Sequence, residues 1–398
     1  TNGEVLQQIV DDFNASQDEI EIKAEYQGTY DDTITKLKAA MQSESGLPDV
    51  CQMYDVGTKF MYDSGAVIPV EDKFESTGYD KSSVMDVISS YYTVEGKQYA
   101  MPFNVSTMLY YNKDVFEAAG LDPETPPTTY DEVLEDAKKI VESGAAPVGY
   151  SQAIYGWFFE QQLAGLGVTY GNNDNGRTEA VTAVDFDSNG GGLKVFDMWK
   201  KLYDSGYFED YGTTTADTQT AFFSGQVGMI IESTAILKNA VDSSPFEVGT
   251  GYLPRIEQND EGGVIIGGGS LWLTDTGNEA NEDAAWKFIE YITTPDVQAK
   301  WSMGTGYFAI NEKAYETDDM KAYLEENPNF MTAINQLKDS PVNCNTAGVL
   351  SGVQTEARLT FNEIMPQVYD GKLTTQDAVD QLAASVNKAI ENYNESIK

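Results

Sequence analysis

Arg358 is the residue of this sequence whose side chain most clearly suggests a binding role. The chain has only 25 basic residues against 64 acidic ones, so each cation is notable. A planar guanidinium binds a carboxylate or a phosphate through two parallel N–H groups. Arg358 could therefore bind an oxyanion, or it could be a surface residue that pairs with Glu356 or Glu363 in the same predicted helix. The residues alone leave both interpretations open.

Two short segments have the composition of anion-binding backbone. Gly267–Ser270 is a run of three glycines and a serine, and Ser233–Thr234 supplies two hydroxyls. Glycine lets backbone N–H groups approach an anion closely, and hydroxyls add donors. The glycines could instead form a tight bend, and Ser233 could cap a helix that begins at Ala235. These interpretations are compatible, because a helix N-terminus itself favours anions.

An aromatic pair, Tyr155 and Trp157, lies in the run GYSQAIYGWFF. Aromatic faces stack on sugar rings or on glycerol, and they also hold choline-like cations. Burial of Trp157 in a hydrophobic core is an equally good interpretation of the residue type. Trp272 is predicted to be a core residue.

The composition excludes several kinds of chemistry. The chain contains no histidine, so the commonest general base and the commonest zinc ligand are missing. A formal net charge of −39 repels nucleic acid and anionic lipid. No apolar run is long enough to span a membrane. We therefore expect that the protein is not an enzyme and that it binds no nucleic acid, no metal and no cofactor.

The two cysteines, Cys51 and Cys344, form no CxxC pair. They could form one disulfide or be two buried thiols, and the apolar run DVCQMY around Cys51 favours buried thiols. The chain opens at Thr1 without a signal segment. We expect an exported protein in its mature or trimmed form.

The length of 398 residues favours two lobes, and strands that alternate with helices favour an α/β sheet. The helix over 129–144 has the clearest signals. Thr129 and Glu132 fit a capping box, and Gly144 lies where a glycine in the left-handed conformation would end the helix. Around Arg358 we expect a helix with Leu359, Ile364 and Val368 inward. Periodicity also predicts helices over 5–13, 34–41, 193–202, 283–292 and 376–393, and strands over 20–26 and 48–54.

Eight segments occur in a characteristic order along nearly the whole chain. They are YQGTYDD, QMYDVGT, PFNVSTMLYYNKDVFEAAGLDPETPP, GYSQAIYGW, FFSGQVGMIIES, IIGGGSLWL, TGYFAI and EARLTF. In this order and spacing they resemble the cluster 1 type of extracellular solute-binding proteins, which feed ABC importers. The resemblance is greatest to the binders of glycerol-3-phosphate and glycerophosphodiesters.

The resemblance implies a periplasmic-binding-protein-like fold of type II. Two α/β lobes are then joined by a multi-segment hinge, with the ligand cleft between them. The implied N-terminal lobe is 1–108 with 255–306, and the implied C-terminal lobe is 109–254 with 307–398. Relatives begin with a strand that this chain lacks before the helix near Glu4, so either the sheet of the first lobe is short of one element or the chain is a trimmed form.

The resemblance also implies a set of ligand-binding residues. Tyr30 and Asp55 match the glycerol side, where the family pattern has glutamate at the Asp55 position. Trp157 matches one of two aromatic wall residues, and Ile154 stands where relatives have the other. The phosphate side is matched by Ser106, Ser233, Gly268, Tyr307 and Arg358.

The function implied is capture of glycerol-3-phosphate or a glycerophosphodiester and its delivery to the ABC importer's transmembrane permease subunits. The alternative is a neutral oligosaccharide as solute, bound for a carbohydrate importer. The protein is expected to be an extracellular monomer, either anchored at the cell surface or periplasmic.

Overall fold

The computed structural model describes residues 2–43 and 46–397, and the chain divides into two compact units. The fold is mixed α/β, as predicted from the alternation of strands and helices. The chain passes from one unit to the other three times. The first unit is Thr1–Val105 with Ile266–Asn327, and the second is Ser106–Ile265 with Pro328–Lys398.

The sheet of the first unit is built around β10 (Gly267–Thr274). β1 (Val50–Tyr54) and β5 (Ala100–Val105) both pair with it in antiparallel fashion, and β2 (Val67–Ile68) pairs with its end. The register places Gly269 of β10 opposite Tyr54 on one side and Phe103 on the other. This pairing positions the glycine run in the middle of the sheet.

Three helices of the first unit pack on one another: α1 (Asn2–Ser16), α13 (Glu279–Ile292) and α14 (Pro295–Thr305). The other elements of this unit are α2 (Tyr30–Ser43), η1 (Asp55–Gly57), α3 (Thr58–Asp63), α4 (Glu71–Thr77), η2 (Lys81–Ser83), α5 (Asp86–Ser89), η3 (Ser90–Tyr92), β3 (Thr93–Val94), β4 (Lys97–Gln98), η5 (Glu312–Glu316) and α15 (Asp318–Glu326).

The predicted strand over 20–26 is wrong, because that segment has no regular secondary structure. The side chain of Asn14 accepts a hydrogen bond from the N–H of Ile22 and donates another to its carbonyl. These backbone groups therefore bond to a side chain instead of to a neighbouring strand. Alternating apolar residues make a strand only where a partner strand is available.

The third change of unit comes later than the sequence suggested. The expected lobes changed after residues 108, 254 and 306, whereas the compact units change after Val105, Ile265 and Asn327. The segment after residue 306 stays with the first unit because it shares a hydrophobic cluster with α14. The buried residues of this cluster are Ala299, Ala309, Ala314 and Met320, and Met303, Tyr315, Tyr323 and Leu324 pack against them.

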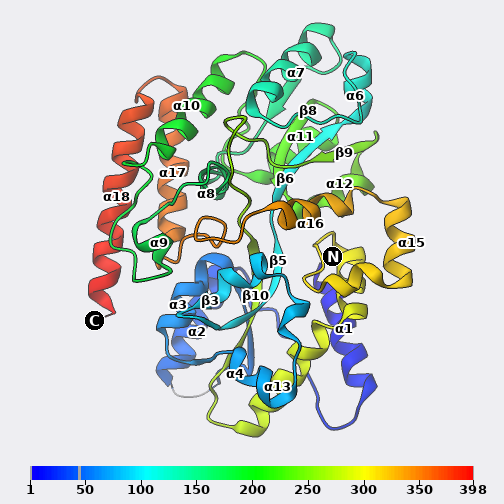
Figure 1. The fold of residues 1–398 in the computed structure, drawn as a ribbon, viewed down its shortest axis with the longest axis vertical. Coiled ribbons are helices and arrows are strands. Elements are labelled where there is room, and N and C mark those ends of the chain that lie inside the picture. The colour runs from blue at the N-terminus through cyan, green and yellow to red at the C-terminus, as the bar shows by residue number, and fades with distance from the viewer. Residues whose placement is uncertain (1, 44–45, 398) are drawn as a thin grey trace. The chain divides into compact units, whose positions relative to one another are not determined.

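The sheet of the second unit has the order β7-β8-β6-β9 (Figure 1). The central strand β6 (Thr107–Asn112) pairs antiparallel with β8 (Val227–Ser233) and with β9 (Val248–Gly251). β7 (Val148–Ser151) joins β8 in parallel. Every residue of β6 is buried, so this strand forms the core of the unit.

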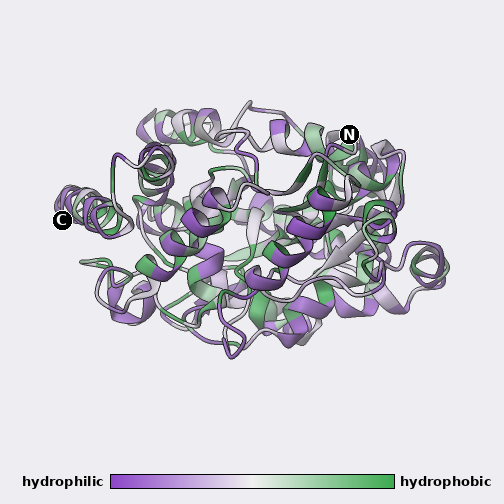
Figure 2. Cartoon of the chain, turned by 90° about the horizontal axis from the view of Figure 1, so that it is seen from above, coloured by the Kyte–Doolittle hydropathy of each residue, from purple (hydrophilic) through white to green (hydrophobic). Residues whose placement is uncertain are grey.

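Helices of the chain carry both hydrophilic and hydrophobic residues, as Figure 2 shows by colour. Those of the second unit are α6 (Lys113–Ala118), α7 (Tyr130–Ser143), α8 (Gly156–Gly165), α9 (Asn172–Gly176), α10 (Gly191–Asp204), α11 (Thr215–Phe223), η4 (Thr234–Ile236), α12 (Leu237–Ser243), α16 (Phe330–Asp339), α17 (Gln354–Tyr369) and α18 (Thr375–Ser396).

The caps predicted for α7 are confirmed. Thr129 and Glu132 form a reciprocal capping box, and Gly144 ends the helix with φ 77°. The inward face predicted for α17 is partly wrong, because Leu359 is 58% exposed while Ile364 and Val368 are buried. Buried α17 residues fall at helical spacing on a different stripe, which contains Ala357, Arg358, Phe361, Ile364, Met365 and Val368.

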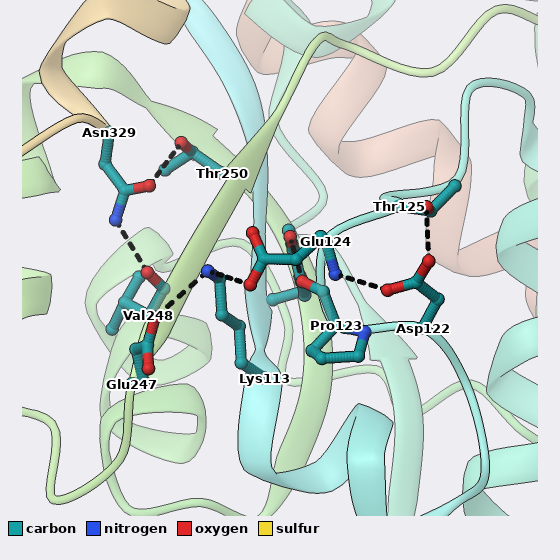
Figure 3. Close-up of polar contacts among 10 residues, drawn as sticks. Lys113, Asp122, Pro123, Glu124, Thr125, Glu247, Val248, Thr250 and Asn329 are labelled. Atoms are coloured by element: carbon teal, nitrogen blue, oxygen red, sulfur yellow. Dashed lines mark hydrogen bonds and ion pairs between the residues drawn. The ribbon is translucent and has the colours of Figure 1, made fainter.

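Lys113 joins two loops of the second unit at the start of α6 (Figure 3). Its ammonium group lies 2.8 Å from a carboxylate oxygen of Glu124 and 3.0 Å from one of Glu247. Figure 3 also shows Asp122 closing the adjacent turn through Thr125 and the backbone of Glu124. The lysine therefore holds the turn after α6 against the chain that enters β9.

Both cysteines are free thiols in the part of the chain that the structure describes. Cys51 is buried in β1, as predicted, whereas Cys344 is only partly buried. Among residues 2–43 and 46–397, no helix is long and apolar enough to cross a membrane.

Candidate functional site

The first unit brings three of the predicted binding residues together. Tyr30, the first residue of α2, stacks on Tyr54 with ring centroids 4.7 Å apart and an interplanar angle of 7°. Burial raises the pKa of Tyr30 well above its usual value, and the nearby groups of Tyr307, Asp55 and Tyr54 raise it further. Asp55 and Tyr307 are thus close enough to Tyr30 to act on it, and we call Tyr30, Asp55 and Tyr307 the polar cluster.

The Tyr30 hydroxyl lies over the glycine run of β10. A Cβ atom added at Gly269 would lie 3.3 Å from the Tyr30 Oη atom and 2.6 Å from Nε2 of Gln52. The absence of a side chain at Gly269 lets both polar groups lie close to the strand. The Tyr30 hydroxyl of the polar cluster therefore lies beside the β10 backbone.

Asp55 is the first residue of the turn that follows β1, and only 5% of it is exposed. The Oγ1 atom of Thr58 donates a 2.7 Å hydrogen bond to the Asp55 carbonyl. The backbone of Asp55 thus forms part of a turn. Its buried carboxylate is a separate feature, because a buried charge requires polar partners.

Gly268 and Tyr307 occupy positions with special backbone geometry. Gly268 has φ +82°, a conformation that side chains with a Cβ rarely adopt. It lies within β10 and pairs with Asn104 of β5, so the glycine run is part of a strand and the predicted tight bend is wrong. Tyr307 follows Gly306, which ends α14 in the left-handed conformation. Its ring packs edge-on against Trp301, with centroids 5.2 Å apart. Tyr307 belongs to the first unit, although the sequence assigned it to the C-terminal lobe.

In the second unit the two predicted serines have structural hydrogen bonds. Ser106 is fully buried, and its Oγ atom donates to the carbonyl of Ile265 at 2.8 Å. Its N–H donates to Oγ1 of Thr234 at 3.0 Å. Ser233 accepts from the N–H of Ala235 at 3.2 Å, as the capping interpretation predicted.

Arg358 is buried, so its interpretation as a surface residue is wrong, and the carboxylate that it faces is that of Glu160. Its Nε atom lies 2.7 Å from Oε1 of Glu160, and its Nη2 atom lies 2.8 Å from Oε2. The two side chains are 9% and 6% exposed. The guanidinium is therefore paired with a carboxylate through two parallel hydrogen bonds.

Trp157 lies in the first turn of α8 and is 5% exposed. Its ring centroid is 6.2 Å from that of Tyr155 and 6.1 Å from that of Phe158. Within the described residues its Nε1 atom has no hydrogen-bond partner, and neither do the buried donors Gln152 Nε2 and Thr218 Oγ1. Buried donors of this kind are rare in proteins, so each calls for an explanation.

Sequence reasoning missed two buried carboxylates, Glu160 and Glu232. Burial raises the pKa of Glu232 to about 7, although hydrogen bonds from the Ser233 backbone and from Gln219 lower it. A signal for both was available. Each glutamate lies within an apolar run, GWFFEQQLAG or VGMIIES, where a charged residue has to be buried and partnered.

The described residues contain no group of three or more acidic or cysteine side chains arranged to hold a metal ion. The candidate residues thus fall into two sets of hydrogen-bonding and aromatic groups, one on each unit. Groups of these kinds can form hydrogen bonds and ring contacts with a polar solute.

Comparison with known proteins identifies the class. Residues 8–332 match the family model described as bacterial extracellular solute-binding protein, and the chain belongs to this family. It is 30% identical to the sn-glycerol-3-phosphate-binding periplasmic protein UgpB of Escherichia coli (strain K12), over 100% of this chain and 91% of that protein. The resemblance stated from the motifs is therefore confirmed.

Solved structures share the fold. The cyclic alpha-maltosyl-1,6-maltose binding protein from Arthrobacter globiformis matches with a TM-score of 0.80 and 26% identity, covering 98% of this chain and 96% of that one. UgpB from Mycobacterium tuberculosis, solved in complex with glycerophosphocholine, matches with a TM-score of 0.82 and 20% identity, covering 98% and 95%. The periplasmic-binding-protein-like fold of type II is thereby confirmed.

The chain is the solute-binding component of an ABC importer, related to UgpB, and it is not an enzyme. It works with the permease subunits of such an importer and binds a small molecule. The family is extracellular and the relative from Escherichia coli is periplasmic.

Proposed function

We propose that this protein captures a glycerophosphoryl compound, either glycerol-3-phosphate or a glycerophosphodiester, and delivers it to the permease. The observation that carries the proposal is the 30% identity, over the whole chain, to a protein named for sn-glycerol-3-phosphate binding. A match of that length keeps the order of all the candidate segments. Two sets of side chains, one on each unit, are proposed to contact the solute.

The polar cluster of the first unit is suited to the glycerol end. The carboxylate of Asp55 accepts hydrogen bonds from vicinal hydroxyls, and the hydroxyl of Tyr30 both donates and accepts. Burial of these groups increases selectivity, because a solute that lacks a hydroxyl leaves a buried partner without its hydrogen bond. The resemblance assigned Gly268 and Tyr307 to the phosphate side, but they belong to the same unit as Tyr30 and Asp55. We therefore propose that they supply a backbone N–H group and a further hydroxyl at the glycerol end.

The second unit is proposed to supply the residues that contact the phosphoryl end of the solute, together with an aromatic side chain that packs beside it. In this unit Arg358 belongs to α17, Ser233 ends β8 and caps η4, and Ser106 lies just before β6. The Nε1 atom of Trp157 has no hydrogen-bond partner among the described residues, which supports a hydrogen bond from Nε1 to an oxygen of the solute. The ring is proposed to pack against the solute as well. This role differs from face-on stacking alone, because the ring is almost fully buried.

Calorimetric titration of the purified chain tests the proposal. Glycerophosphocholine and sn-glycerol-3-phosphate are titrated separately, with maltotriose as the neutral comparison. Saturable binding of at least one phosphate ester, and none of maltotriose, is expected. Binding of maltotriose alone contradicts the proposal.

A neutral oligosaccharide is the second candidate, and one structural observation favours it. The charge of Arg358 is already balanced by Glu160, so the phosphate side has less positive charge than an unpaired arginine would give. A structural relative at 26% identity is named for binding a cyclic maltosyl-maltose. An Arg358→Met, Glu160→Met double variant separates the two candidates, since binding of a neutral sugar should survive while binding of a phosphate ester should weaken.

A further inference from the structure

We propose that Glu160 determines the charge of the solute that this protein accepts. By pairing with Arg358, it favours phosphodiesters, which carry one negative charge on phosphorus, over phosphomonoesters, which carry two. This inference rests on the proposed function, in which Arg358 is near the phosphoryl group. Glu160 acts through Arg358 and is a positioning residue.

The geometry of the pair carries the argument. The Nε and Nη2 atoms of Arg358 form one edge of the guanidinium, and each faces a different oxygen of the Glu160 carboxylate, at 2.7 and 2.8 Å. This is the edge-on, two-bond arrangement through which arginine also binds phosphate. The pair carries no net charge, so Arg358 meets the solute as half of a neutral unit.

Neighbouring residues hold the pair in place. The Nε2 atom of Gln354, one turn before Arg358 on α17, donates to the same Oε1 atom of Glu160 at 2.9 Å. At Gly156, an added Cβ would lie 2.5 Å from the Cα atom of Arg358, so only glycine lets α8 approach α17 this closely. The N–H of Gly156 also donates to Oδ1 of Asn362 at 2.9 Å. The two helices are thus fixed to each other around the ion pair.

A phosphate cannot readily replace the glutamate. Both side chains are almost fully buried, and removing Arg358 from Glu160 leaves a buried carboxylate without its balancing charge. The cavity beside Glu160, lined also by Leu163, Tyr170 and Ile265, has a volume of only about 10 Å³. That volume holds no more than a water molecule, so the solute does not reach Glu160 from this side.

Other charges near the proposed phosphate side do not compensate. Glu232, the residue before Ser233, is a second buried carboxylate. The hydroxyls of Ser106 and Ser233 are neutral, and each has a backbone partner. A second negative charge on the solute therefore meets no additional cation among these residues, and the affinity for a dianion should be lower.

Two matched ligands test the inference on the protein as it is. sn-Glycerol-3-phosphate and its phosphate methyl ester differ by one charge and one methyl group, and at about pH 8 the monoester is a dianion. Calorimetric titration should give the methyl ester an affinity at least about tenfold higher. Equal affinities, or tighter binding of the monoester, would overturn the inference while leaving the proposed function intact.

The Glu160→Gln variant tests the residue itself. It keeps the side-chain volume and removes the negative charge, so the preference for the methyl ester should fall by about tenfold or more. Glu356→Gln on the same helix removes a charge from an exposed position and should leave the preference unchanged. A folded Glu160→Gln protein with the wild-type preference would overturn the inference.

The two proposals fail in different ways. Binding of neither ester by the wild-type protein would overturn the proposed function and this inference with it. Should the Glu160→Gln variant fail to fold, the matched-ligand comparison on the wild-type protein decides the inference alone.

Discussion

The Oγ atom of Ser106 donates a 2.8 Å hydrogen bond to the carbonyl of Ile265. Ser106 is the first residue of the second unit and Ile265 is the last residue before the chain returns to the first. Two of the three crossings of the chain are thus joined within the second unit by one buried hydrogen bond. The Ile265 carbonyl also accepts from Nε2 of Gln161 at 2.7 Å.

Ser106→Ala should lower the free energy of unfolding by about 1 kcal/mol. The loss is modest because the Ile265 carbonyl keeps its bond from Gln161. Urea denaturation checks the value. Ser205→Ala, which removes a similar side-chain-to-backbone hydrogen bond at the half-buried end of α10, is the matched control for stability. A loss of solute affinity in Ser106→Ala beyond that in Ser205→Ala would support a direct contact between Ser106 and the solute.

Tyr30→Phe should lower the affinity for a glycerophosphoryl solute by about tenfold or more, because a buried solute hydroxyl loses its partner. The stack on Tyr54 does not involve the hydroxyl, so stability should change little. Tyr26→Phe is the matched control, since Tyr26 is 91% exposed. Unchanged affinity in Tyr30→Phe would remove Tyr30 from the proposed set.

Glu232 makes stability depend on pH. Its pKa is about 7 in the folded protein against an ordinary value of 4.5, so between these values the folded state binds more protons than the unfolded state. The free energy of unfolding therefore falls as pH rises from about 4.5 to 7, by roughly 3 kcal/mol at most from this group.

The variant Glu232→Gln should lack this contribution. Its stability relative to the wild-type protein should rise across that pH window and level off above about pH 7. Chemical denaturation of both proteins at several pH values measures the difference. A difference that does not vary with pH would show that Glu232 has an ordinary pKa.

Arg358→Met should destabilise the protein by about 3–5 kcal/mol, because it leaves Glu160 buried without its partner. The double variant Arg358→Met, Glu160→Met should lose much less, since it removes both charges together. A double-mutant cycle on unfolding free energies measures the coupling. Independent, additive effects would mean that the ion pair contributes nothing to the fold.

The sequence predicted the fold well wherever a pattern was local. The capping box at Thr129, the stop at Gly144 and the helix over 376–393 depend on residues a few positions apart, and all three are present. The predicted strand over 20–26 was wrong because a strand needs a neighbouring strand to bond with. Here the side chain of Asn14 makes the hydrogen bonds to the backbone of Ile22 instead.

The candidate site could be predicted only in part for the same reason. The resemblance assigned Tyr30 and Asp55 to the glycerol side and Tyr307 to the phosphate side, whereas in the structure both Asp55 and Tyr307 are close enough to Tyr30 to raise its pKa. The partner of Arg358 could not be read from the sequence, because Glu160 lies 198 positions away. Long-range pairs of this kind depend on how helices pack, which local periodicity does not encode.

The central claim is that the solute is a glycerophosphoryl compound. Native mass spectrometry of the full chain, incubated with equal concentrations of glycerophosphocholine, sn-glycerol-3-phosphate and maltotriose, tests it most directly. The account predicts one bound molecule per chain, with the mass of a phosphate ester and with glycerophosphocholine dominant. A complex carrying maltotriose, with no phosphate ester bound, would contradict it.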